Sequence, residues 1–248
     1  MNKTLIIAHR GDTYDAPENT LSAINLAWER GAEAVECDVH LSKDNNIIVI
    51  HDDNTFRTTG ENHKIRELNL DELKKIDAGS WHGEQWKEEP IPALEEVLDT
   101  IPSCGKLLIE IKSDHEIIPI LKNILDKSGI KKEQIILMDF NYNSVCEMKK
   151  YFPGYEILLL STMRKMKFFY ISTNELIDKT LKPGLTGLNL MGQNRINVEL
   201  VEKIKNSGLK LYIWTVDNPE EVKRLIDLGV DGIATNRAEW IKKELKLL

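Results

Sequence analysis

The sequence predicts an α/β protein whose 248 residues form one (β/α)8 barrel. Short apolar runs alternate with amphipathic segments along the whole chain, and no break in composition divides it into two parts. The length agrees, because a barrel of this class usually takes about 250 residues. An open doubly wound sheet is the second candidate fold. It is less favoured because neither G-x-G-x-x-G nor G-x-x-x-x-G-K-[ST] follows a strand.

The apolar runs are the predicted strands. Several are apolar on both faces, which is typical of a buried parallel sheet. In chain order they occupy residues 4–8, 33–39, 47–50, 107–111, 135–138, 156–160, 186–190, 210–216 and 231–235.

The segments between these runs are the predicted helices. Leu21, Ile24 and Trp28 have the spacing of one helix face, as do similar residues in 200–204 and 222–226. Asn218-Pro219 has the pattern of a helix start, with a capping side chain followed by proline. Glycines stand where four predicted helices end, at Gly31, Gly129, Gly208 and Gly229.

Residues 52–92 interrupt this alternation. The segment is rich in turn residues and carries none of the regular strand and helix pattern. A connection this long inside a compact domain is usually functional or has small elements of its own. We therefore expect a single domain over 1–248 in which 52–92 form a capping insertion after the second barrel strand.

Charge and composition restrict the function. Lys and Arg number 33 against 40 acidic residues, a net charge of −7, so a nucleic-acid partner is not expected. An anionic substrate would need a local cation. Three cysteines without a CxxC pair are typical of a reducing compartment. No apolar run exceeds four residues, far short of a membrane span or a signal peptide, so we expect a cytoplasmic protein without stable membrane insertion.

Acidic residues on two predicted strands indicate a metal site. Glu36 and Asp38 are two residues apart and share one strand face, and Glu110 occupies a similar position on the next barrel strand. The carboxyl ends of barrel strands form the active-site face, so these carboxylates are expected to converge there. Such a cluster favours one divalent cation with oxygen ligands, Mg²⁺ or Ca²⁺, with Mn²⁺ a further candidate. For Glu110, an ion pair with Lys112 is the structural alternative.

Two histidines follow apolar strands and are candidate acid–base catalysts. His9 and His51 should both face the mouth of the barrel, where one would remove a proton and the other deliver one. His63 and His115 are assigned to the surface, and His40 is also expected to be exposed. His82, in the insertion, is left open between packing and substrate contact.

Two cations complete the predicted site. Arg10 offers a planar fork for two phosphate oxygens, and Lys112 offers a point charge. Cations, a metal and two histidines around one point suit the cleavage of a phosphodiester. A protein that only bound phosphate would need the cations but not the two histidines.

The motifs in this order resemble those of the glycerophosphodiester phosphodiesterase family. The likeness covers nearly the whole chain, and its specificity comes from the order of the motifs rather than from any one of them. The residues that carry it are His9-Arg10-Gly11, Ala16-Pro17-Glu18-Asn19-Thr20, Glu36-x-Asp38-Val39, Lys43-Asp44, Val49-x-His51-Asp52, Arg57-Thr58-Thr59, Asp77-Ala78-Gly79-Ser80-Trp81, Ile91-Pro92-x-Leu94-Glu95-Glu96-Val97-Leu98, Glu110-Ile111-Lys112, Trp214-Thr215-Val216 and Gly229-Val230-Asp231-Gly232-Ile233.

The resemblance implies a TIM barrel that hydrolyses glycerophosphodiesters, small-molecule substrates, to an alcohol and sn-glycerol 3-phosphate. It implies acid–base catalysis by His9 and His51 and a divalent metal held by Glu36, Asp38 and Glu110. It also implies phosphate contacts from Arg10 and Lys112, and an aromatic side chain beside the glycerol, Trp214.

Two positions depart from the family pattern. Asp139-Phe140 stands where Ser-Phe is frequent, and Thr235-Asn236 where Thr-Asp is frequent. We expect neither to touch the metal or the histidine pair. Asp139 would either select a cationic head group or cap a helix, and Asn19 is expected to cap the first helix.

Two other functions remain as alternatives. One is a related barrel phospholipase of the sphingomyelinase D or phosphoinositide phospholipase C type. The other is a protein that binds glycerophosphodiesters without cleaving them. The oligomeric state is not predicted.

Overall fold

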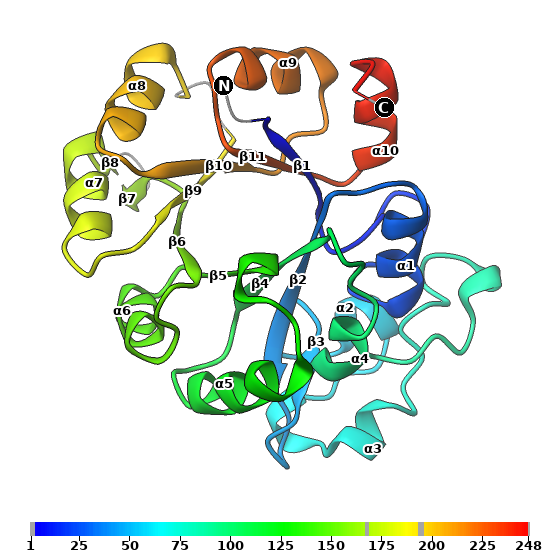
Figure 1. The fold of residues 1–248 in the computed structure, drawn as a ribbon. Helices are drawn as coiled ribbons and strands as arrows, with labels where there is room; N and C mark the ends of the chain where they lie inside the picture. Colours follow the sequence, from blue (N-terminus) through cyan, green and yellow to red (C-terminus); the bar gives the residue numbers. More distant parts are fainter. Residues whose placement is uncertain (1–2, 167–168, 193–195, 248) are drawn as a thin grey trace.

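A closed barrel of eight parallel strands forms the centre of the computed structural model, which describes residues 3–166, 169–192 and 196–247. The strands follow the predicted apolar runs, and pairing of β1 with both β2 and β11 closes the ring (Figure 1). The (β/α)8 barrel expected from the sequence is confirmed. Around the ring lie β1 (Leu5–Ala8), β2 (Ala34–Leu41), β4 (Lys106–Ile111), β5 (Ile135–Asp139), β6 (Glu156–Ser161), β9 (Gly187–Met191), β10 (Lys210–Trp214) and β11 (Gly232–Thr235).

The predicted strand at 47–50 does not belong to the barrel. It forms β3 (Ile47–Val49), which pairs antiparallel with the end of β2 outside the barrel. The chain reverses between them in a turn in which the amide of Ser42 donates to the carbonyl of Asn46 at 2.9 Å. This short hairpin brings His51 back toward the carboxyl end of β2.

The helices cover the outside of the barrel and start and stop where the sequence indicates. Asn218 accepts hydrogen bonds from the amides of Glu220 and Glu221 at the start of α9, and the four helix-ending glycines all have positive φ. The outer helices are α1 (Leu21–Glu29), α4 (Leu94–Leu98), α5 (Ile117–Ser128), α6 (Tyr142–Tyr151), α7 (Thr173–Leu181), α8 (Val198–Asn206), α9 (Pro219–Asp227) and α10 (Ala238–Glu244).

Two apolar layers separate the inside of the barrel from its outside. On β2, Val35, Cys37 and Val39 belong to the outer layer against the helices. The alternate residues of β2 therefore face the interior of the barrel, which also holds an inner apolar cluster that includes Met138 and Tyr212. This alternation is what aims Glu36 and Asp38 inward.

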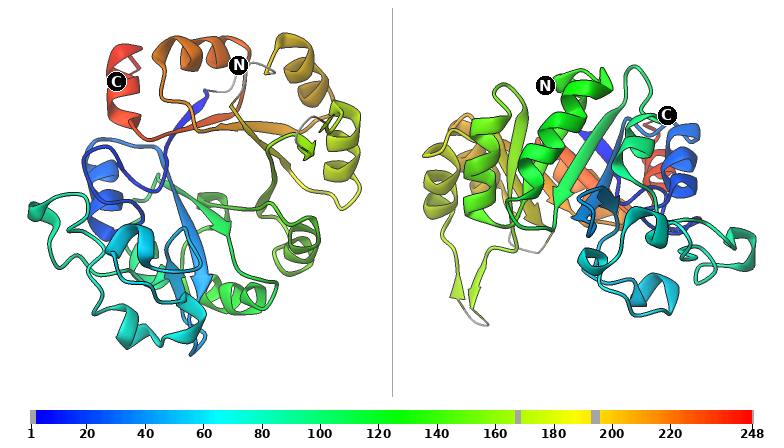
Figure 2. Two further views of the ribbon diagram at one scale, coloured as in Figure 1. Left: turned by 180° about the vertical axis from the view of Figure 1, so that it is seen from behind. Right: turned by 90° about the horizontal axis from the view of Figure 1, so that it is seen from below.

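The insertion of residues 52–92 carries only short elements. These are α2 (Phe56–Thr59), the 3₁₀ turns η1 (Ile65–Glu67) and η2 (Glu84–Trp86), and α3 (Leu70–Leu73). Its apolar side chains pack with Ile48 and Ile50 of the β3 segment in a small separate cluster. The insertion and the β7–β8 hairpin (Arg164–Met166 and Phe169–Tyr170) project from the same side of the barrel (Figure 2).

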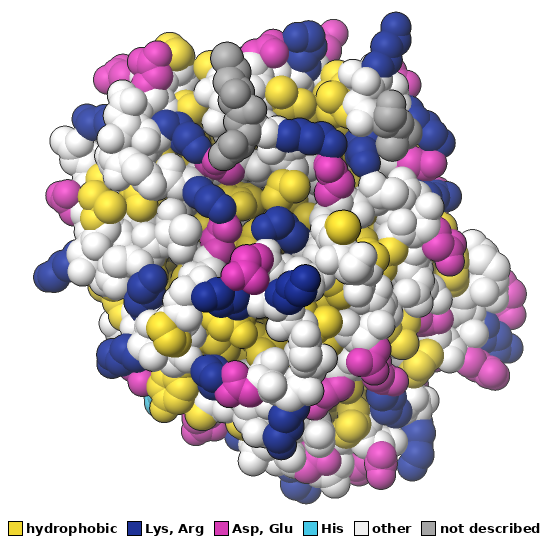
Figure 3. Space-filling model, viewed as in Figure 1, with side chains coloured by type: hydrophobic (Ala, Val, Ile, Leu, Met, Phe, Trp, Pro, Cys, Tyr) yellow, Lys and Arg dark blue, Asp and Glu magenta, His cyan; other side chains and the backbone are white. Residues whose placement is uncertain are grey.

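Basic and acidic side chains are interspersed on the face drawn in Figure 3. Some ion pairs lie at the amino ends of barrel strands: Nζ of Lys210, at the start of β10, is 2.6 Å from a carboxylate oxygen of Glu156, at the start of β6. Such pairs at the amino ends of strands are structural, since barrel active sites form at the carboxyl ends. Among the described residues, no helix is long and apolar enough to cross a membrane.

Candidate active site

A cavity of about 80 Å³ opens at the carboxyl ends of the barrel strands. It collects side chains from loops and strands that are far apart in the sequence. Of the eight predicted site residues, seven line it, and the eighth, Asp38, is fully buried beside it. The seven are His9, Arg10, Glu36, His51, Glu110, Lys112 and Trp214.

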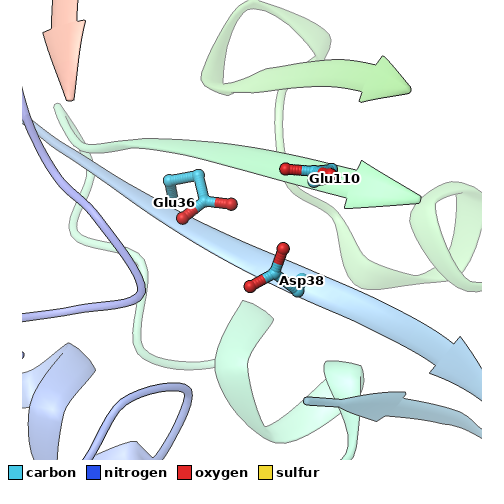
Figure 4. A group of neighbouring side chains, drawn as sticks. All are labelled: Glu36, Asp38 and Glu110. Carbon is cyan, nitrogen blue, oxygen red and sulfur yellow. The ribbon is translucent and has the colours of Figure 1, made fainter. Parts of the chain in front are cut away.

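Three buried carboxylates converge at this cavity (Figure 4). Glu36 and Asp38 come from β2, and Glu110 comes from β4, where it pairs in register with Asp38. One oxygen from each lies within 4.8 Å of the others. Among the described residues Glu36 Oε1 has no hydrogen-bond partner, while Asp38 Oδ1 and Glu110 Oε1 contact Nζ of Lys112. A buried cluster of carboxylate oxygens is the donor set that a hard divalent cation prefers.

The proximity of these carboxylates disturbs their protonation. Burial, reinforced by Asp38 and Glu110, raises the pKa of Glu36 well above its usual range. Burial and the charge of Asp38 raise the pKa of Glu110 to about 7. Burial also acts on Asp38, but the charges of Lys112 and Arg10 outweigh it and hold the pKa of Asp38 below its usual value. When all three carboxylates are ionised they outnumber the two cations beside them, so a divalent metal ion would relieve the repulsion that raises the pKa values of Glu36 and Glu110.

Arg10 and Lys112 lie against the cluster from opposite sides of Asp38. Nε of Arg10 is 3.0 Å from Asp38 Oδ2, and its backbone amide donates to Glu36 Oε2 at 2.9 Å. Nζ of Lys112 is 3.2 Å from Asp38 Oδ1 and forms a closer ion pair with Glu110. The ion pair considered as the alternative for Glu110 is thus present. It does not supply a partner for Glu36 Oε1.

His9 is held by a chain of side chains from the last two barrel loops. Asn236 donates through Nδ2 and its backbone amide to Asp217, both at 2.8 Å, so its Oδ1 is the atom that accepts from His9 Nδ1 at 2.7 Å. The ring therefore carries its proton on Nδ1 and leaves Nε2 unprotonated, 4.0 Å from Glu36 Oε2. Burial and the neighbouring Arg10 lower the pKa of His9 to about 4, so the ring is neutral near pH 7.

The expectation that Asn236 would not touch the histidine pair is wrong. Position 236 follows β11, and the closed barrel places this end beside β1 and His9. Sequence distance concealed the contact, since 227 residues separate the two partners.

His51 is fixed at its ring and at its backbone. Nδ1 forms a 2.5 Å hydrogen bond with Asp52 Oδ1, and the backbone carbonyl of His51 accepts from Nε2 of His40 at 3.0 Å. His40 was expected to be exposed, but its side chain is buried. It lies within β2, under the returning hairpin, because β2 extends further than the sequence indicated.

One arginine of the insertion connects Glu18, the partner of Arg10, with Asp52, the partner of His51. Arg57, on α2, donates through NH1 and NH2 to both oxygens of Glu18 at 2.8 Å and through Nε to Asp52 at 2.7 Å. Glu18 in turn accepts from Arg10 at 2.9 Å. Sequence reasoning missed this network, although all its members lie in the motifs that resemble the family. The available signal was a pair of unassigned charges, Glu18 and Arg57, within those motifs.

Asn19 orients a carboxylate and does not cap a helix. Its Nδ2 donates to Asp38 Oδ2 at 2.9 Å, and its Oδ1 accepts from the backbone amide of Asp38 at 3.1 Å. The cap of α1 is the next residue, Thr20, whose side chain accepts from the amide of Ala23. Asn19 has φ of 57°, a left-handed conformation that asparagine tolerates, and this turns its amide inward toward β2.

Two aromatic rings form the apolar wall of the cavity. Trp214 and Phe140 meet edge to face with ring centroids 5.6 Å apart. Asp139, the neighbour of Phe140, is buried, and its carboxylate accepts from the amide of Asn141 at 2.7 Å beside the start of α6. Asp139 does not cap α6, because the cap is Asn141, whose side chain accepts from the amides of Asn143 and Ser144. Burial raises the pKa of Asp139 to about 6.

Clustered carboxylates, two cationic side chains and two histidines at the carboxyl face of a (β/α)8 barrel are the groups that a barrel phosphodiesterase would use. The chain matches the model of the Glycerophosphoryl diester phosphodiesterase family over residues 9–240. It belongs to this family, and its enzyme class is that of the phosphoric diester hydrolases.

Individual relatives agree with this assignment. The chain is 39% identical to the glycerophosphodiester phosphodiesterase of Caldanaerobacter subterraneus subsp. tengcongensis, over 96% of each chain. A phosphodiesterase of Oleispira antarctica, solved in complex with the product sn-glycerol-3-phosphate, has a TM-score of 0.89 at 28% identity and covers 98% of this chain and 97% of its own. The glycerophosphodiester phosphodiesterase of Thermotoga maritima has a TM-score of 0.80 at 26% identity, with both chains fully covered.

Proposed function

We propose that this protein hydrolyses glycerophosphodiesters to an alcohol and sn-glycerol 3-phosphate, using one divalent cation and the histidine pair His9 and His51. The observation that carries the proposal is the convergence of three buried carboxylates and both histidines at one cavity. The relative from Oleispira antarctica, solved with sn-glycerol-3-phosphate, supports the substrate class. The alternative of a protein that only binds substrate does not account for two separately supported histidines.

The metal would be held by Glu36, Asp38 and Glu110, which each bring a carboxylate oxygen to the same place and of which Glu36 keeps one buried oxygen, Oε1, without a partner among the described residues. When bound, Mg²⁺, Ca²⁺ or Mn²⁺ would withdraw charge from the phosphoryl oxygens of the diester. Arg10 and Lys112 would bind the same oxygens, and both already lie within 3.2 Å of Asp38. The site thus places positive charge where negative charge develops as phosphorus is attacked.

The two histidines have different partners and so suit different roles. His9 is neutral with Nε2 unprotonated, so it accepts a proton from the attacking oxygen. His51, whose Nδ1 is held by the carboxylate of Asp52, delivers a proton to the departing alcohol oxygen. Each ring is fixed by a hydrogen bond at Nδ1, which leaves Nε2 for the proton transfers of acid–base catalysis.

We further propose that residues 52–92 act as a capping insertion that supports the site from one side of the mouth. The insertion contacts His51 directly through Asp52, and Arg57 bonds to both Asp52 and Glu18, the partner of Arg10. The side chain of Arg57 is 43% exposed, so the free energy of unfolding should depend little on it.

Arg57→Ala is expected to lower kcat about 10- to 100-fold, the usual effect of removing an outer partner of a site residue. Both Glu18 and Asp52 would lose their fixed orientation, and with them Arg10 and His51. Steady-state kinetics on glycerophosphocholine would measure it. Arg66→Ala is the matched control, because Arg66 belongs to the same insertion but bonds to Asn45 and Glu116. Equal kinetics for the two variants would contradict the role of Arg57.

Asn236→Ala is expected to lower kcat about 10- to 100-fold with little change in KM, since the amide fixes the orientation of the His9 ring. Asn197→Ala is the control, because Asn197 caps α8 and its removal should affect only stability, by about 1 kcal/mol. If Asn236→Ala keeps the kcat of the wild type, His9 does not depend on this contact.

A further inference from the structure

Asn189 is a polar side chain inside the apolar part of the barrel. It lies on β9, where its register partners are Leu160 on β6 and Tyr212 on β10, both members of the inner apolar cluster. Its neighbours on β9, Leu188 and Leu190, belong to the outer layer. Asn189 therefore points into the barrel, and it is only 3% exposed.

The amide of Asn189 is poorly satisfied. Nδ2 lies 3.3 Å from the thioether sulfur of Met138, a weak acceptor, and Oδ1 has no hydrogen-bond partner within the described ranges. Exchanging the two amide atoms would leave the nitrogen without a partner instead. A buried amide of this kind costs free energy unless something else completes its hydrogen bonds.

The cavity of the candidate active site provides the space for that partner. Asn189 lines it together with Met138, Leu160 and Ala234, on the side that also carries Trp214. The volume of about 80 Å³ exceeds the space of a single water molecule several times. Trp214 Nε1 donates to the backbone carbonyl of Asn189 at 3.3 Å, which fixes the aromatic wall relative to the amide.

We propose that Asn189 is the residue that recognises a hydroxyl of the glycerol half of the substrate. This inference rests on the proposed function. The apolar floor suits a three-carbon chain, while one neutral amide suits a hydroxyl and offers nothing to a second charged group. The glycerol half is common to all glycerophosphodiesters, so this contact selects for the class and not for a head group.

The inference is tested by binding, with sn-glycerol 3-phosphate and propyl phosphate compared by calorimetry in one metal-containing buffer. Propyl phosphate has the same three-carbon chain without hydroxyls. Wild type is expected to bind sn-glycerol 3-phosphate about tenfold more tightly, and Asn189→Leu to bind the two ligands equally. Asn189→Ala, which cannot overpack the site, should behave in the same way if the leucine variant fails to fold.

Leu108→Met is the matched control, because it changes the same cavity without removing the amide or its contact with Met138. It is expected to keep the wild-type ratio of the dissociation constants of propyl phosphate and sn-glycerol 3-phosphate. The inference is overturned if wild type binds the two ligands with equal affinity. It is also overturned if Asn189→Leu or Asn189→Ala still prefers sn-glycerol 3-phosphate as strongly as wild type, in which case Asn189 holds structural water.

The test is separate from that of the proposed function. Turnover of glycerophosphocholine by wild type is measured in parallel. Selective binding that depends on Asn189 without any turnover would support the subsite and contradict the proposed hydrolysis. Turnover without Asn189-dependent selectivity would support the hydrolysis and overturn the subsite.

Discussion

His9→Ala and His51→Ala are each expected to lower kcat for a glycerophosphodiester by about 10² to 10⁴, with fold and metal binding largely intact. Both histidines follow short strands and line the cavity, and neither belongs to an apolar cluster, so alanine removes a proton carrier and not a core side chain. Steady-state assays on the purified variants would measure the decrease in kcat, and circular dichroism would check that the variants fold.

A substrate with an activated leaving group separates the two roles. Because such an alcohol departs without protonation, it should restore much of the activity of His51→Ala and little of that of His9→Ala. The double variant should lose less than the sum of the single losses, since residues acting in one step are not additive. His63→Ala is the control, because the side chain of His63 is 45% exposed in the insertion and its Nε2 lies 3.3 Å from Glu61. Near wild-type rates for both single variants would show that the acid–base pair is misidentified.

Removal of the divalent cation is expected to abolish turnover, and Mg²⁺, Mn²⁺ or Ca²⁺ should each restore some of it. Three carboxylates in one buried cluster repel one another, and burial raises the pKa of Glu36 well above its usual range. Metal binding should therefore also raise the melting temperature, since a ligand that binds only the folded state stabilises it. Full activity in a sample verified to be free of metal would contradict the proposed site.

Glu36→Gln gives this experiment an internal control. The variant should lose the metal-dependent rise in melting temperature, while its metal-free form should be at least as stable as metal-free wild type. The reason is that glutamine removes one of the repelling charges without changing the shape of the side chain. A variant that still gains stability from the metal would show that Glu36 is not a ligand.

The barrel was predictable because its determinants are local. Apolar runs such as 135–138, helix-ending glycines and the capping Asn218 each report on their own segment, and the segments repeat. Strand alternation likewise placed Glu36 and Asp38 on one face without any knowledge of the neighbours. β3 was less predictable, because a strand of three residues does not reveal which partner it pairs with or in which direction.

The supports of the site were not predictable because they depend on contacts between distant segments. Asn236 reaches His9 only because the barrel closes, and Asn19 reaches Asp38 only through a left-handed backbone conformation. Arg57 depends on the path of an insertion that has little regular structure. The sequence thus identified the chemical groups, while the fold supplied the partners that orient them.

The most direct test of the central claim is product analysis after hydrolysis of glycerophosphocholine in oxygen-labelled water. The account predicts that metal-loaded wild type yields sn-glycerol 3-phosphate with the label on its phosphate and unlabelled choline, and that a chelated sample yields neither. Label in choline, release of glycerol and phosphocholine, or the same yield after chelation would contradict it.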